Sequence, residues 1–373
     1  MMKNYLLPSN RRVFKDIKSL NLKERISVLI RNPFNQFLLL GVALLIVNLL
    51  AQTEIIPISM TLSVSAVIIY AIISIGFCLL LGYSGLASLG TAGFAGIGVY
   101  ATYYLMQVLI QLPEGGKTAW APYSFVFALI VAIILAIIIG LFVGFISLRI
   151  EGMYLAILTL GLAEILFKVF QNLNQMPKIE MGNIVFFGIK MDNSMKFVVI
   201  TVIFVLLLIL TNNIINSPTG RAMLAMKNST SAAQAMGISL IKYRLMAFVI
   251  STIYAAIGGV LYIVNTRAIA ASSSTFLSLS FSLNILGAVI VGGSKSLLGT
   301  TFGALVIFGL QSIFFINIPF FQKNPEFMGI LTGILLVVIV MFYPGGLSQL
   351  YLEIKGKIRK KKEQRRIKKY GIN

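Results

Sequence analysis

The chain has 373 residues, of which 58% are hydrophobic and 11% are charged, and its mean hydropathy is +0.93. Soluble domains carry about a quarter charged residues. One or two soluble cores of this length do not hide so much apolar surface, so lipid must solvate a large part of the chain. The composition excludes an ordinary soluble domain and predicts an all-α integral membrane protein.

Of the net charge of +20, +18 lies in three blocks of the sequence. Residues 1–31 hold eight Lys and Arg against two acidic residues, and residues 353–373 hold ten against two. Residues 213–244 add four more, Arg221, Lys227, Lys242 and Arg244. Basic clusters beside long apolar segments follow the positive-inside rule and bind anionic headgroups. The charge therefore indicates membrane lipid, and not nucleic acid, as the partner of these residues.

The first predicted element is a basic, mostly polar N-terminal segment over residues 1–35. No small-residue cleavage site follows the first apolar run, so we expect no cleavable signal peptide. Asn21, with Glu24 three residues later, resembles a capping box. This pattern predicts a short helix over Leu22–Ile30 at the membrane surface, ending before Pro33.

A transmembrane domain is predicted next, over residues 36–345, followed by a basic tail over 346–373. A helix needs about 20 mostly apolar residues to cross about 30 Å of hydrocarbon. Ten runs approach this length, near 37–51, 58–81, 86–110, 122–147, 152–171, 197–216, 245–264, 280–294, 298–318 and 326–344. The expected fold is therefore a bundle of about ten transmembrane helices.

The charge blocks also predict the orientation of the chain in a bacterial-type inner membrane. With the N-terminus inside and ten crossings, the loop 213–244 falls between the sixth and seventh spans and lies in the cytoplasm. The tail then lies on the same side. An odd count, or an error before residue 213, would place a basic block outside, against the positive-inside rule. Both termini are therefore expected in the cytoplasm.

No set of residues in the sequence fits an enzyme. The chain has no histidine and a single cysteine, Cys78, so it lacks a His/Cys metal site and a histidine-activated nucleophile. The stretch Gly293-Ser-Lys295-Ser296 lacks the upstream glycine and the Gly-Lys pair of a Walker loop. We expect no catalytic residue, no metal and no cofactor, and the chain does not hydrolyse ATP by itself.

Two glycine-rich stretches, 82–98 and 292–303, interrupt the apolar pattern, and both contain Leu-Gly-Thr. Small residues let membrane helices approach closely, which is one reading of these stretches. The other reading is a broken or re-entrant helix, whose exposed backbone groups line a water-filled path. The two readings are compatible, and we keep both.

Few ionisable residues fall inside the predicted spans, and two of them are Glu164 and Lys168. They are four residues apart in the order that favours an ion pair on a helix surface. Alternatively, Glu164 is the carboxylate that a carrier driven by an ion gradient needs within the bilayer. The residues alone leave both readings open.

Four collinear blocks of residues follow a spacing that is shared by a known family. They consist of Gly82, Tyr83, Gly85, Ser88, Leu89, Gly90 and Phe94; Leu148, Arg149, Gly152, Tyr154, Leu155, Ala156, Thr159, Leu160, Gly161 and Glu164; 217–222, 232–238 and Tyr243; and Gly292, Gly293, Ser296 and Gly299. In these blocks the chain resembles the permease subunits of branched-chain amino-acid ABC importers, of the LivM type. The resemblance covers about residues 40–350.

The resemblance implies a transport subunit for branched-chain or similar small amino acids, with several partners. These would be a second, homologous permease, two ABC ATPase subunits that bind the ATP, and an extracytoplasmic solute-binding protein. Thr91 stands where the family usually has histidine, and Glu151 where a basic residue is common. Importers of urea or amides share this build, so the solute stays open. An ion-coupled secondary carrier is the alternative from another class.

A helix over Asn228–Ile238 is the expected site of coupling to an ATPase. Asn228, Ser229 or Thr230 can cap its start, the alanines favour helix, and Gly237 is a natural C-terminal stop. The expected coupling residues are Arg221, Asn228, Ala232, Ala233, Gln234, Ala235 and Gly237. A surface helix that merely connects two spans is the alternative.

A second set of residues is expected along the solute path or in the helix packing beside it. It consists of Gly82, Tyr83, Gly85, Ser88, Gly90, Tyr154, Thr159 and Glu164. The first five come from the glycine-rich stretch, and the last three come from the fifth predicted span. We expect bulky replacements at Gly85 or Gly90 to stop transport even when they are apolar.

Overall fold

The structure is a computed structural model that describes most of the apolar part of the chain. The described residues are 33–53, 57–110, 123–147, 153–173, 179–180, 185–186, 189–269, 275–315, 318–323, 326–343 and 345–350, with Glu353 and Gly356. The expected surface helix Leu22–Ile30, the residue Glu151 and most of the basic tail lie outside these residues.

Helices make up almost all of the described chain. In the first half they are α3 (Pro33–Gln52), α4 (Ile58–Cys78), the π-helix η2 (Leu79–Ser84), α5 (Thr91–Ile110), α6 (Ser124–Ser147) and α7 (Met153–Leu173). In the second half they are α8 (Asn193–Asn216), α9 (Pro218–Asn228), α10 (Thr230–Ala235), α11 (Leu240–Thr266), the 3-10 turn η4 (Thr275–Leu277), α12 (Leu279–Gly292), α13 (Leu297–Ala304), the π-helix η5 (Leu305–Phe314), α14 (Pro319–Lys323) and α15 (Glu326–Phe342).

The predicted helical membrane fold is confirmed. Among the described residues, seven helices are long and apolar enough to cross a membrane, and α12 and α15 are shorter apolar helices. The remaining expected span coincides with the glycine-rich α5, which has 20 residues. Each of the ten apolar runs in the sequence therefore coincides with a helix or a pair of consecutive helices.

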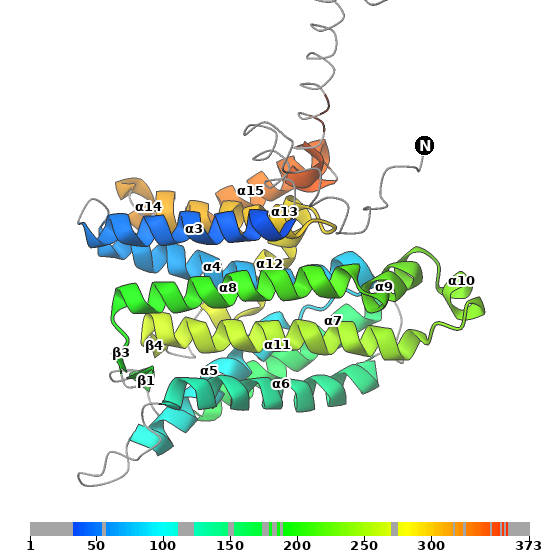
Figure 1. Cartoon of the computed structure of the whole chain (residues 1–373), viewed down its shortest axis with the longest axis horizontal. Helices are drawn as coiled ribbons and strands as arrows, with labels where there is room; N and C mark the ends of the chain where they lie inside the picture. The colour runs from blue at the N-terminus through cyan, green and yellow to red at the C-terminus, as the bar shows by residue number, and fades with distance from the viewer. Residues whose placement is uncertain are drawn as a thin grey trace, which may run out of the picture.

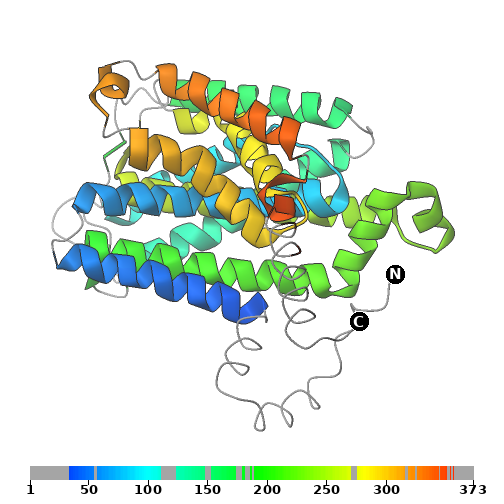
Figure 2. The same ribbon diagram turned by 90° about the horizontal axis from the view of Figure 1, so that it is seen from above.

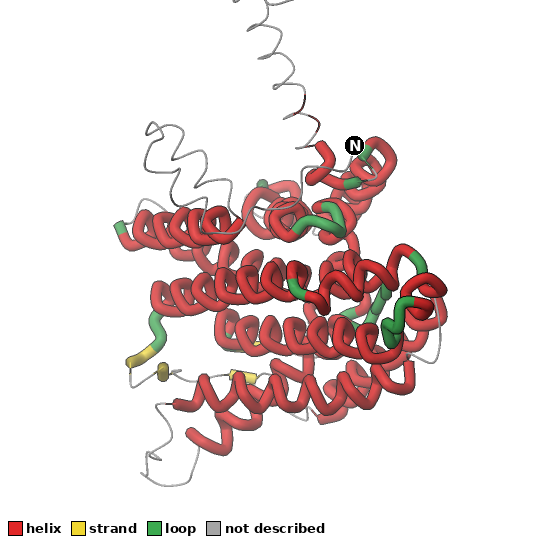
Figure 3. The backbone as a smooth tube through the Cα atoms, turned by 45° about the vertical axis from the view of Figure 1, so that its right-hand side comes forward, coloured by secondary structure: helices red, strands yellow, loops and turns green. Residues whose placement is uncertain are grey.

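Four strands of two residues each are the exception to the helical fold. The strand β1 (Ile179–Glu180) pairs antiparallel with β4 (Ala268–Ile269), and β2 (Val185–Phe186) pairs with β3 (Ile189–Lys190). The first pair joins the loop after α7 to the loop after α11. The tube in Figure 3 shows helix throughout the bundle, with the short strands confined to one end.

The long helices lie side by side along the long axis of the molecule (Figure 1). At one end α9 and α10 extend beyond the bundle, on the right in Figures 1 and 2, and the strands lie at the opposite end. The chain leaves α8 and enters α11 at the end that carries α9 and α10. The region that the charge pattern predicted as a cytoplasmic loop is therefore a projecting helical element.

The core of the bundle is built on α4 and α11. In the apolar stretches of α4 with η2 and of α11, 78% of the residues are buried. The share of buried residues is 17% for α3, 28% for α6 and 22% for α7. Lipid is as apolar as leucine, so helices in a membrane associate through close packing rather than through hydrophobic exclusion. At Gly98 on α5 and Gly259 on α11 a β-carbon would overlap the backbone of the opposite helix, at Ala256 and Ala95 respectively. Glycine at both positions lets the two helices meet backbone to backbone.

Candidate functional site

The first glycine-rich stretch contains a break in the helix that runs through α4 and η2. The helix ends at Gly85, which has a φ of 76°, in the left-handed region that favours glycine. Residues 85–90, which we call the first break, are not helical, and α5 begins at Thr91. Leu86, Ser88 and Gly90 are buried within the bundle. The broken-helix reading and the close-packing reading both describe part of this stretch.

Side chains from two other helices satisfy backbone N–H groups around the first break. The Leu89 N–H donates to the Thr159 hydroxyl on α7 at 3.0 Å, and the Ala92 N–H donates to the Ser282 hydroxyl on α12 at 3.0 Å. Within the break, the Gly90 N–H donates to the Ser88 hydroxyl at 3.3 Å. Irregular backbone at membrane depth needs such partners, because lipid offers none. The sequence predicted Ser88, Gly90 and Thr159, but it gave no signal for Ser282.

The second glycine-rich stretch forms a short turn that packs directly against the first. Helix α12 ends at Gly292, and residues 293–296, which we call the second break, precede α13. A β-carbon on Gly82 would overlap the Ser294 carbonyl, so only glycine fits there. The Cys78 thiol donates to the same carbonyl at 3.2 Å, and the Tyr83 hydroxyl donates to the Lys295 carbonyl at 3.1 Å. The second break therefore packs against the helix end, in α4 and η2, that leads into the first break.

The expected coupling helix forms at the tip of the projecting region, although it is shorter than Asn228–Ile238. Residues 218–238, which we call the coupling arm, contain α9, α10 and the turn after them. Ser229 has extended backbone and its hydroxyl accepts from the Ala232 N–H at 3.3 Å, so it caps α10, and Asn228 instead ends α9. Gly237 has a φ of 76° and ends the helix as predicted.

The coupling arm leaves most of the predicted coupling residues open to solvent. Arg221, Asn228, Ala232, Gln234, Ala235 and Gly237 are exposed. Met236, directly after α10, is 82% exposed. Ala233 is the exception, because its side chain is 3% exposed and faces inward. Ala233 therefore contributes to the packing inside the arm and does not belong to its outer surface.

The residues predicted on α7 separate into an inward and an outward group. Thr159 is buried at the first break, whereas Tyr154 is 71% exposed and Glu164 is also exposed. No atom lies within 4 Å of where a β-carbon on Gly161 would be, so this outer face has no neighbour within the described chain. The eight predicted residues therefore lie in two separate places and do not form a single site.

The expected ion pair between Glu164 and Lys168 is not formed within the part of the chain that the structure describes. The Lys168 ammonium instead donates to the side-chain oxygen of Gln171 at 3.4 Å. A spacing of four residues puts two side chains on one face of a helix, but it does not choose between neighbouring partners.

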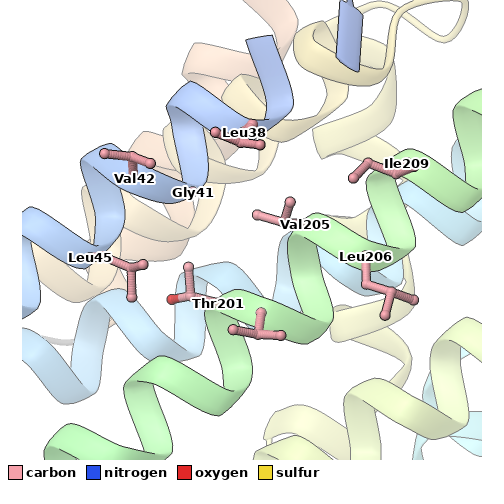
Figure 4. Close-up of a pocket in the computed structure, with 9 residues that line it drawn as sticks. Leu38, Gly41, Val42, Leu45, Thr201, Val205, Leu206 and Ile209 are labelled. Carbon is pink, nitrogen blue, oxygen red and sulfur yellow. The ribbon is translucent and has the colours of Figure 1, made fainter. Parts of the chain in front are cut away.

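An apolar groove between α3 and α8 does not suit a polar solute. It has a volume of about 380 Å³, and Figure 4 shows Leu38, Val42, Val205 and Leu206 along it. Thr201 is the only polar residue among its lining residues. Sites for small polar ligands need a few polar groups that fix the orientation of the ligand. This groove resembles a surface for lipid chains more than a path for an amino acid.

The fold and the site together define a multi-pass helical membrane protein with a broken helix in its core and a helical arm at one end. The chain belongs to the family described as the permease component of the branched-chain amino acid transport system, whose model matches residues 59–340. It is a transport component and not itself an enzyme, and such a permease works with ATPase and solute-binding partners.

Individual relatives agree with this family. The chain is 27% identical over 313 residues to the high-affinity branched-chain amino acid transport system permease protein LivM of Escherichia coli, covering 75% of this chain and 67% of that one. It is 27% identical over 319 residues to the "Probable branched-chain amino acid transport permease protein LivM" of Methanocaldococcus jannaschii, covering 75% and 90%. No solved structure matches this chain at a significant level.

Proposed function

We propose that this chain is the membrane-spanning subunit through which an ABC importer takes up a branched-chain or similar small amino acid. The observation that carries the proposal is the coupling arm, which projects from a bundle of the permease family (Figure 1). Small side chains at Ala232 and Ala235 allow α10 to enter a cleft, and the exposed Met236 offers an apolar contact. We assign the outer face of α10 to docking on an ATPase subunit.

The assembly that we propose has four further subunits and delivers the solute from outside. Two ATPase subunits bind the arms of this permease and of a second, homologous permease, and an extracytoplasmic binding protein supplies the solute. The relatives in Escherichia coli and Methanocaldococcus jannaschii are named for branched-chain amino acid transport, which supports this solute class. The open outer face of α7, with Tyr154, Gly161 and Glu164, is our candidate for the contact with the second permease.

We propose an orientation in which the coupling arm and both termini lie in the cytoplasm of a bacterial cell. Arg221 and Lys242 are exposed at the arm end, where the positive-inside rule places basic residues. Lys323 on α14 is exposed and lies on the opposite side in this orientation. An impermeant thiol reagent should therefore label Lys323→Cys, but not Lys242→Cys, in intact cells that carry Cys78→Ala. The reverse labelling pattern would invert the orientation.

The test of the solute is uptake by the complete complex in proteoliposomes. We expect labelled leucine to enter only with ATP and the binding protein, and valine and isoleucine to compete with it. Competition by urea or short amides alone would move the chain to the importers of those solutes. Uptake that needs no ATP and stops when an ionophore collapses the ion gradients would favour a secondary carrier.

The test of the arm is a large charged side chain on its outer surface. Ala235→Arg should abolish solute-stimulated ATP hydrolysis and uptake while the subunit still inserts, because a docked small-residue helix has no room for it. Thr53→Arg, at an exposed position just after α3, is the matched control and should leave both activities intact. Normal stimulation in Ala235→Arg would make the arm a plain connector between two spans.

A further inference from the structure

We propose that Lys227 is the residue that transmits movement of the coupling arm to the first break. Lys227 lies in the last turn of α9, inside the arm, and the end of η2 leads directly into the break. The proposal rests on the proposed function in one respect, which is that the arm is where an ATPase docks. It adds a physical link between that docking surface and the candidate solute path.

The link consists of two hydrogen bonds between segments that are far apart in the sequence. The Lys227 ammonium donates to the Gly82 carbonyl at 2.7 Å and to the Leu81 carbonyl at 3.1 Å. Both carbonyls belong to the last turn of η2, where a helix runs out of its own N–H donors. A cation is also favourable there, because the helix dipole leaves partial negative charge at the C-terminus. Lys227 thus caps the end of a helix that belongs to another part of the chain.

The stem of Lys227 lies across the start of the break. A β-carbon on Gly85 would be 3.2 Å from the Lys227 Cγ, so the side chain passes over the residue at which the helix ends. Lys227 is half-buried, and burial lowers the pKa of its ammonium. The nearby Lys295 lowers this pKa further, whereas Cys78 raises it. The charged ammonium is therefore held by the two carbonyls rather than by bulk solvent.

The positions of the neighbouring residues make Lys227 a short connection between α10 and the first break. Thr230, the first residue of α10, follows Lys227 by three residues, and Gly85 follows Gly82 by three residues. Met223 and Met226 are buried and anchor α9 in the bundle next to Lys227. A shift of α10 therefore moves the ammonium, and the two carbonyls carry this movement into the break.

The experiment uses the complete complex and measures solute imported per ATP hydrolysed. Lys227→Met keeps the length and the apolar stem of the side chain but removes the donors. We expect this ratio to fall by about tenfold or more in Lys227→Met, because a hydrogen bond from a charged donor is among the stronger ones in a protein. Lys227→Arg keeps the cation and its donors and should stay within about twofold of the unmutated protein.

The controls separate this proposal from the docking of the arm. Lys242→Met removes a cation at an exposed position nearby and should leave the ratio unchanged. If Lys227→Met keeps a normal ratio while Ala235→Arg abolishes ATPase stimulation, the link through Lys227 is wrong and docking at the arm stands. If Ala235→Arg behaves normally, the proposed function of the arm fails instead. Equal losses in Lys227→Met and Lys227→Arg would assign Lys227 to packing and overturn the proposal.

A second measurement keeps the proposal testable if Lys227→Met does not insert. The unmutated complex and Lys227→Arg are compared as the pH rises, with Lys295 and Cys78 as the other titratable groups near Lys227. Because the pKa of Lys227 is lowered, its ammonium loses its charge as the pH rises into the alkaline range. The amount of solute imported per ATP hydrolysed should therefore fall in the unmutated complex. Arginine stays charged, so Lys227→Arg should show a flat profile. Identical profiles would overturn the proposal.

Discussion

The two breaks carry similar residues but hold their backbone in different ways. The first break depends on side chains from elsewhere, because Thr159 on α7 accepts the Leu89 N–H within it and Ser282 on α12 accepts the Ala92 N–H just after it. The N–H groups at the second break are held locally, since Ser296 donates its N–H to the Gly293 carbonyl at 3.0 Å and its hydroxyl caps α13. Its carbonyls, in contrast, accept from Cys78 and Tyr83 at the end of the helix before the first break. The N–H groups around the first break therefore respond to movements of α7 and α12, whereas those of the second break depend on residues of the same turn.

The contact between η2 and the second break is where a substitution should have the largest effect. In Gly82→Ala the new methyl group would overlap the Ser294 carbonyl, and both partners are backbone, so neither can rotate away. We expect a loss of about 3 kcal/mol or more of folding stability. Melting of the purified subunit and its level in the membrane both measure this loss.

Gly329 provides the control for this substitution. It lies in α15, and no atom is within 4 Å of where its β-carbon would be. Gly329→Ala should leave stability unchanged or raise it by up to about 1 kcal/mol through helix propensity. Equal stability in Gly82→Ala and Gly329→Ala would show that the contact between η2 and the second break does not contribute to stability.

The next largest effect is expected where α7 supports the first break. Thr159→Val keeps the shape of the side chain but removes the acceptor of the partly buried Leu89 N–H. Leaving that group without a partner should cost about 1–3 kcal/mol. Hydrogen exchange at Leu89 should become faster, and uptake should fall. Thr159→Ser restores the hydroxyl and should recover most of the loss, whereas no loss in Thr159→Val would mean that the break holds itself.

A smaller effect is expected in the second break. Ser296→Ala removes the hydroxyl that accepts from the Gly299 N–H at 3.1 Å and caps α13. The loss of a helix cap costs about 1 kcal/mol. Because the other hydrogen bonds of the turn, from the Ser296 N–H, Cys78 and Tyr83, remain, uptake should stay near normal while melting shifts slightly. A larger loss of transport in Ser296→Ala than in Thr159→Val would reverse the roles that we give to the two breaks.

The sequence predicted the elements of this molecule better than it predicted their contacts. Long apolar runs and glycines are local signals, so the helices, the first break and the capped arm followed from them. The contact between Gly82 and Ser294 joins residues more than two hundred positions apart, and no local pattern encodes it. In the sequence Lys227 is one of four basic residues that flank the coupling helix near headgroups or acidic ATPase residues, and no local pattern shows that its ammonium reaches the end of another helix.

The smallest effect is expected at Glu164, on the side of α7 that faces away from the first break. Its side chain is exposed and forms no ion pair with Lys168, so neutralising it removes little interaction energy within the subunit. An ATP-driven permease also needs no titrating carboxylate for coupling. Glu164→Gln should therefore keep ATP-dependent uptake within about twofold of the unmutated complex.

The same variant distinguishes the two ways of driving transport, because a carrier coupled to an ion gradient would rely on this carboxylate. Uptake is measured with ATP maintained and the ion gradients collapsed by an ionophore. The unmutated complex, Glu164→Gln and Lys168→Gln are compared, and Lys168→Gln is the control that neutralises a charge on the same face. Uptake that survives in the unmutated complex and in both variants shows that ATP, and not an ion gradient, drives transport. If uptake instead stops when the gradient collapses, and Glu164→Gln but not Lys168→Gln loses uptake, the ion gradient acts on the outer face of α7. The first break would then respond to movement of α7.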